Sequence, residues 1–192
     1  MSSQSSAPKS FTRFKNLLLT GPPRCGKTTV LERVEEQLGE LRMAGFVTRE
    51  LREQGQRVAF EAIGLGGRRV ILAHVRFRSL VSVGRYGVEP NRLIPLINEE
   101  MVRPLETVDT YLIDEIGKME CHCPQFIGAM SRLLEGSVPV VATIALRGDG
   151  FIAEVKDRRD VQIVEVTRAN RQALPEQIAA WVKQIANQAN TP

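Results

Sequence analysis

Residues 16–34 read NLLLTGPPRCGKTTVLERV and combine an apolar run, a Gly-Pro turn and a helical pattern. The apolar run 17–19 is typical of a strand that is buried on both faces. A Gly-Pro-Pro turn at residues 21–23 ends this strand. Apolar residues then recur at three- and four-residue intervals, which predicts a helix over about 27–42 with one face packed on a sheet. The stretch therefore predicts a strand, a loop and a helix in that order.

The loop between this strand and helix has the pattern Gly21-x-x-x-x-Gly26-Lys27-Thr28. Backbone N–H groups in such a loop can surround a phosphate chain, and the helix N-terminus adds partial positive charge. We expect Lys27 to neutralise the β and γ oxygens and Thr28 to bind Mg²⁺. The expected nucleotide-binding residues of the loop are Gly21, Pro22, Pro23, Arg24, Cys25, Gly26, Lys27, Thr28 and Thr29.

A second buried strand, in the stretch DTYLIDE at residues 109–115, ends in two acids. We expect Asp114 to hold Mg²⁺, usually through water. Glu115 is placed to orient and deprotonate a water that attacks the γ-phosphate, so we predict that Glu115 and Lys27 are the catalytic residues. The residues expected to contribute to nucleotide binding here are Tyr111, Leu112, Ile113, Asp114, Glu115, Ile116 and Gly117.

Three short β-like runs, residues 45–51, 57–64 and 68–75, follow the first helix. Gly-containing turns separate these runs, so they predict an antiparallel meander. The segment 82–89 is expected to be a loop, and apolar residues at four-residue spacing predict an amphipathic helix over 93–105.

The rest of the chain continues the alternation of buried strands and helices. Pro124 can open a helix, residues 138–146 and 161–166 indicate core strands, and the pattern over about 175–189 predicts a final helix. Such alternation is typical of an α/β fold with a mainly parallel central sheet that helices flank.

The length of 192 residues and the hydrophobic content of 43% suit one globular domain. We expect a flexible N-terminal tail over 1–13 and a single domain over 14–189, with the β meander at about 45–75. No apolar stretch is long enough for a membrane span, and the Ser-rich N-terminus lacks a signal-peptide core. Three cysteines without such a signal favour reduced thiols, so we expect a cytoplasmic protein.

The formal charge of +4 with 20 arginines favours anionic partners. This charge is too small to identify a nucleic-acid-binding protein, and aromatic residues make up only 5% of the chain. Because proteins that bind single strands usually stack bases on aromatic side chains, the sequence gives nucleic-acid binding weak support.

The chain resembles the small nucleoside-triphosphatases first characterised in thermophilic prokaryotes, which have a cancer-related human counterpart. The resemblance rests on five segments in family order, which read GPPRCGKTT, GFVTRE with RVAFEAIGL, VGRYGVE, IDEIGKME and VTRANR. It covers roughly residues 14–186, and IDEIGKME is much more specific than the phosphate loop alone.

This resemblance implies a RecA-like phosphate-loop fold and Mg²⁺-dependent hydrolysis of ATP, GTP, CTP and UTP to the diphosphates. It also implies slow turnover and broad base selectivity, and we expect a monomer. Phosphate loops of this kind often carry glycine where this chain has Arg24. We expect the Arg24 side chain to be exposed.

Several further residues are candidates for contacts to phosphate or base. Charge that develops on the γ-phosphate is often met by an arginine, so Arg85, Arg147 and Arg171 each qualify. Thr143 could sense the γ-phosphate or bond a neighbouring backbone group. Asn170 and Arg171 could frame the base edge, or they could form the turn that leads to the last helix.

Two other functions stay open at this point. In a nucleoside or nucleotide kinase an acceptor hydroxyl replaces the water, although no arginine-bearing lid is evident in the sequence. In a nucleotide-switched nucleic-acid-binding protein, the arginine-rich meander would bind RNA or DNA.

Overall fold

The computed structural model describes residues 14–189 as an α/β structure built on one nine-stranded sheet. The predicted tail lies outside these residues. The strands are β1 Asn16–Thr20, β2 Met43–Glu53, β3 Gln56–Gly64, β4 Arg69–His74, β5 Val81–Val83, β6 Tyr86–Val88, β7 Thr110–Ile116, β8 Val140–Ile144 and β9 Val161–Glu165. The helices are α1 Lys27–Gln37, η1 Pro90–Leu93, α2 Ile94–Glu100, η2 Leu105–Thr107, η3 Glu120–His122, α3 Pro124–Glu135, α4 Phe151–Lys156 and α5 Leu174–Ala189.

The strand order β5-β6-β4-β3-β2-β7-β8-β1-β9 joins two halves of different character. The pairs from β2 through β7, β8 and β1 to β9 are parallel. The pairs from β2 through β3, β4 and β6 to β5 are antiparallel. The fold class is therefore as predicted, and the meander extends the central sheet because its first strand, β2, also pairs with β7.

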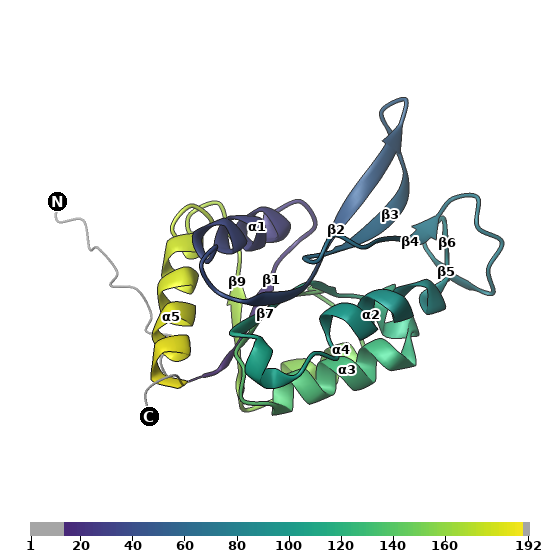
Figure 1. Ribbon diagram of the computed structural model, residues 1–192. Coiled ribbons are helices and arrows are strands. Elements are labelled where there is room, and N and C mark those ends of the chain that lie inside the picture. The colour runs from purple at the N-terminus through teal and green to yellow at the C-terminus, as the bar shows by residue number, and fades with distance from the viewer. Residues whose placement is uncertain (1–13, 190–192) are drawn as a thin grey trace, which may run out of the picture.

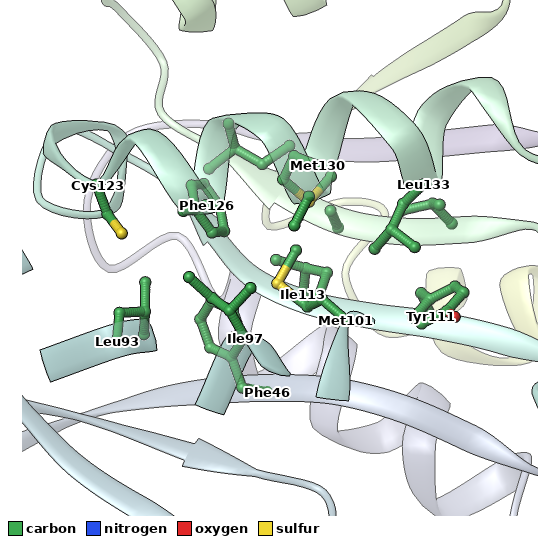
Figure 2. Close-up of a cluster of buried hydrophobic side chains, with 14 of the residues drawn as sticks. Phe46, Leu93, Ile97, Met101, Tyr111, Ile113, Cys123, Phe126, Met130 and Leu133 are labelled. Atoms are coloured by element: carbon green, nitrogen blue, oxygen red, sulfur yellow. The ribbon is translucent and has the colours of Figure 1, made fainter. Parts of the chain in front are cut away.

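Helices cover both faces of the parallel half. Helices α1 and α5 lie together on one face, and α2, α3 and α4 lie on the other (Figure 1). The β2–β3 hairpin extends away from this body. Figure 2 shows the core beneath α3, where Phe126, Met130 and Leu133 point toward Tyr111 and Ile113 of β7. No helix among residues 14–189 has the length and apolar character needed to cross a bilayer.

Strand β2 approaches β7 so closely that only glycine fits at position 45. Gly45 has a φ of 126°, and a Cβ there would lie 1.9 Å from the Leu112 carbonyl oxygen. Because a backbone oxygen cannot move aside as a side chain does, glycine fixes how near the meander lies to the central strands. This approach positions Thr48, three residues further along β2, beside the end of β7.

Three predicted elements differ from the structure. Helix α1 ends at Gln37, not near residue 42, because residues 38–40 form a turn and the Leu41 N–H bonds the Leu38 carbonyl three residues back. The predicted helix over 93–105 ends at Glu100.

The third difference is the segment 82–89, which was predicted to be a loop. It contains most of the β5–β6 hairpin, whose strands have only three residues each. Strands of this length carry almost no alternation of apolar and polar residues, so the sequence pattern could not identify them.

Candidate functional site

The loop between β1 and α1 depends on backbone conformations that most side chains avoid. Gly21 and Gly26 have φ angles of 147° and 107°, and Arg24 is left-handed at 65°. A Cβ at Gly21 would lie 2.8 Å from Cys25 Sγ. The exposed Arg24 therefore takes a conformation that glycine adopts more easily, at the position where such loops often carry glycine.

Lys27 and Thr28 are the first two residues of α1. The N–H groups of a first helical turn lack partners within the helix and point out of its N-terminus. The Lys27 Nζ lies 3.3 Å from the Gly21 carbonyl oxygen, so the ammonium group lies across the loop. Free N–H groups, the helix dipole and an ammonium group together form a site that favours anions.

Asp114 is the polar centre of the site. It is 1% exposed, and three hydroxyl groups bond its carboxylate. Thr143 donates to Oδ1 at 2.6 Å, while Thr28 and Thr48 donate to Oδ2 at 2.9 and 3.2 Å. Three such bonds fix the orientation of the Asp114 carboxylate. The contact between Thr28 and Asp114 brings the phosphate loop and the acidic strand together.

The sheet order explains how these residues meet. Strands β1, β8 and β7 are parallel neighbours, so their carboxyl ends reach the same edge of the sheet. Thr143 lies on β8, between the loop that follows β1 and Asp114 on β7. The Thr143 hydroxyl donates a hydrogen bond to Asp114. The sequence had suggested a contact to the γ-phosphate or to a neighbouring backbone group instead. Thr48 was not predicted, although it lies within the quoted segment GFVTRE.

Glu115 is half-buried and faces a cavity of about 470 Å³. Gly21, Lys27 and Gly117 also line this cavity. Burial raises the pKa of Glu115, the nearby Lys27 opposes this rise, and the charge of Asp114 adds to it. The Asp114–Glu115 peptide bond is cis. A carboxyl group that can exchange a proton thus lies beside the lysine of the loop.

A second cavity, of about 490 Å³, opens on the same residues from the side of the meander. Lys27, Thr28 and Glu115 line it together with three arginines, Arg24, Arg49 and Arg57. Arg49 and Arg57 were not among the arginines selected from the sequence. Both are on the β2–β3 hairpin, whose first strand pairs with β7, so strand order brings them to this cavity.

Several residues that were predicted to bind the nucleotide lie in the hydrophobic core. Tyr111, Leu112, Ile113 and Ile116 are fully buried, so these four side chains pack in the core and position the strand. In the loop, Pro22 and Thr29 are exposed, and Cys25 packs against the cluster beneath α1 and α5.

The candidate arginines occupy three different places. Arg147 lines the cavity that contains Lys27 and Glu115. Arg85 lines a neighbouring cavity with Arg24. Arg171 lies near the phosphate loop, since a Cβ built on Gly26 would be 3.7 Å from the Arg171 Cδ. Of the three, Arg147 faces the cavity with the acid and the lysine.

Asn170 fits the turn alternative. Its side-chain oxygen accepts a bond from the Thr167 N–H, and its side-chain nitrogen donates to the Glu165 carbonyl, each at 2.8 Å. Both ends of the amide are thus used by the backbone between β9 and α5. A base edge would have to compete with these bonds.

Glu120 also lines the cavity of Glu115, although its carboxyl is almost entirely buried. Burial raises its pKa to about 8, and the charges of Glu115 and Asp114 add to the rise, whereas backbone N–H groups oppose it. In the unfolded chain the group ionises near its ordinary value of 4.5. The folded protein therefore binds the extra proton, and its stability falls as the pH rises between these values.

The variant Glu120→Gln should lack this pH dependence, because glutamine resembles the protonated acid and does not titrate. We expect the melting temperature of metal-free parent protein to fall relative to that of the variant as the pH rises from about 4.5 to 8. Thermal melts across this range measure the difference, and exposed Glu176→Gln is the matched control. A constant gap between parent and Glu120→Gln would contradict the assignment.

The chain matches the family model described as NTPase over residues 16–179. It is 40% identical over 174 residues to the nucleoside-triphosphatase THEP1 of Natranaerobius thermophilus, with 88% of this chain and 97% of that protein covered. It is 33% identical over 184 residues to the mouse cancer-related nucleoside-triphosphatase homolog, with 88% and 97% covered. The crystal structure of THEP1 from Aquifex aeolicus superposes with a TM-score of 0.79 at 30% identity, covering 88% of this chain and 99% of that one.

Proposed function

The chain belongs to the NTPase family and is a nucleoside-triphosphatase of the phosphate-loop type, and from that premise we propose that it hydrolyses nucleoside triphosphates in an Mg²⁺-dependent reaction. The products are the nucleoside diphosphate and inorganic phosphate. The proposed substrates are ATP, GTP, CTP and UTP, with slow turnover and weak selection for the base.

The contact between Thr28 and Asp114 carries the proposal. A hydroxyl and a carboxylate from distant segments lie side by side at the mouth of an anion site. Both are oxygen donors, which is the ligand type that Mg²⁺ prefers, so these two residues fit a nucleotide-bound Mg²⁺. When bound, Mg²⁺ would neutralise charge on the phosphate oxygens.

The chain's own residues have distinct roles in this proposal. The loop amides and Lys27 bind the phosphate oxygens and hold the terminal phosphoryl group in position. Glu115 accepts the proton of the attacking water, since its carboxyl faces the same cavity as Lys27. Arg147, on the rim of this cavity, is the proposed cation for charge that develops on the γ-phosphate.

Phosphate release from purified protein tests this proposal. ATP, GTP, CTP and UTP should each yield one phosphate and the diphosphate without any added acceptor, at rates that differ by less than about tenfold, since no base contact is assigned. A kinase would instead need an acceptor hydroxyl. Formation of the diphosphate only after addition of nucleosides, with a phosphorylated nucleoside in place of free phosphate, would overturn hydrolysis in favour of phosphoryl transfer.

A further inference from the structure

Four arginines gather in a cavity of about 550 Å³ beside the phosphate loop. Arg24 comes from the loop itself, Arg52 and Arg57 from the β2–β3 hairpin, and Arg85 from the turn between β5 and β6. These segments are far apart in sequence. The fold, not the local sequence, therefore assembles the cluster.

Aromatic rings hold two of these guanidinium groups in place. Arg57 Nε donates to the Tyr86 hydroxyl at 2.8 Å, and Arg85 Nε donates to the same oxygen at 3.3 Å. Both guanidinium carbons lie over the Tyr86 ring, at 5.5 and 5.4 Å from its centroid, and Arg57 also lies 4.9 Å from the centroid of Phe60. Such stacking orders the arginine side chains before any ligand binds, which lowers the entropic cost of binding.

The positive charge of the cluster is only partly compensated. Glu50 bonds two of the arginines, Arg52 at 2.7 Å and Arg57 at 2.5 Å. Among the described ion pairs, no carboxylate contacts Arg24 or Arg85. Like charges held together repel one another, and an anion with several oxygens would relieve this repulsion while accepting guanidinium N–H bonds.

The arginine cavity opens toward the nucleotide site. Arg24 and Arg57 line both this cavity and the one that contains Lys27, Thr28 and Glu115. Arg52 and Arg85 line the arginine cavity and not the cavity that contains Lys27. The remaining guanidinium groups of the cluster are thus placed for a second phosphate group beyond the first.

We propose that Arg24, Arg52, Arg57 and Arg85 form a second phosphate site, which binds the phosphate of another nucleotide or of a nucleic-acid strand while a nucleoside triphosphate occupies the loop. Bidentate N–H groups recognise phosphate oxygens in either source. The exposed arginines can also stack on a base. The proposed ligand of the arginine-rich meander is therefore a phosphate group. Its binding does not depend on whether the nucleotide in the loop is hydrolysed.

Binding measured with the loop already filled tests this site separately from the proposed NTPase activity. The protein is first saturated with Mg²⁺ and a non-hydrolysable ATP analogue, and analogue binding is verified for each variant. AMP is then titrated by calorimetry, and a labelled single-stranded oligothymidylate is titrated by fluorescence anisotropy, both at low ionic strength.

The double variant Arg52→Gln/Arg85→Gln should weaken probe binding by about tenfold or more, as expected for lost charge-assisted bonds. The control Arg132→Gln/Arg159→Gln removes the same charge from exposed arginines elsewhere and should bind like the parent. Binding of AMP identifies a mononucleotide as the source, and binding of the oligothymidylate alone identifies a strand. Absence of binding by both probes, or equal loss in the two double variants, would overturn the site.

Discussion

Replacing Glu115 by glutamine should lower the turnover of ATP by about 10²-fold and leave the affinity for ATP nearly unchanged. Glutamine has almost the same shape but cannot accept the proton of the attacking water. Glu115 has no described hydrogen bond to the loop, so the exchange should leave the loop's own contacts to phosphate in place. Steady-state phosphate release gives turnover, and equilibrium titration with a non-hydrolysable analogue gives affinity.

The exposed Glu36→Gln on α1 provides the matched control, because it removes one carboxylate outside the cavities described above. This control should release phosphate at the parental rate. Parental turnover in Glu115→Gln would remove Glu115 from the mechanism, even if the rest of the site is correct.

Lys27→Ala should reduce both affinity and turnover, with a loss in kcat/KM of about 10²-fold or more. The ammonium group lies across the loop at the Gly21 carbonyl, where it meets phosphate oxygens both before and during bond breaking. The same two assays separate affinity from turnover, and the exposed Lys183→Ala on α5 controls for the lost charge. An unchanged affinity for the ATP analogue in Lys27→Ala would contradict a phosphate site at this loop.

The sequence could predict the parts of the site that depend on local spacing. Gly21, Gly26, Lys27 and Thr28 form one short loop whose backbone requirements appear directly as residue types. Asp114 was recognised in the same way, since it follows a run of buried apolar residues. For these residues, the same few sequence positions determine both the local backbone conformation and the chemical groups of the site.

The residues that complete the site depend on strand order, which local patterns do not contain. Thr48 and Thr143 bond Asp114 only because β2 and β8 lie on either side of β7. Arg57 lines the cavity with Lys27 because its strand β3 pairs with β2, and β2 pairs with β7. The local sequence around each of the 20 arginines does not indicate which of them line the cavity.

The end of helix α1 and the role of Asn170 were also difficult to predict from the sequence. The helix from Lys27 was predicted too long because Leu38 and Leu41 continue its apolar spacing, yet a turn at Gly39 ends it. Asn170 has the side chain expected of a ligand contact, but the turn after β9 uses both ends of its amide. Local spacing does not distinguish a functional side chain from one that closes a turn.

In the proposed mechanism, the phosphate loop and Asp114 bind one Mg²⁺–nucleotide complex between them. The measurement that tests it most directly is the affinity for ATP with Mg²⁺ and with EDTA, determined by calorimetry for Glu115→Gln and for Glu115→Gln/Asp114→Asn, so that hydrolysis does not interfere. We predict that Mg²⁺ strengthens binding to Glu115→Gln by about tenfold or more, and that the added Asp114→Asn change abolishes this gain. An equal gain from Mg²⁺ in both proteins would show that Asp114 does not serve the metal, and would contradict the account.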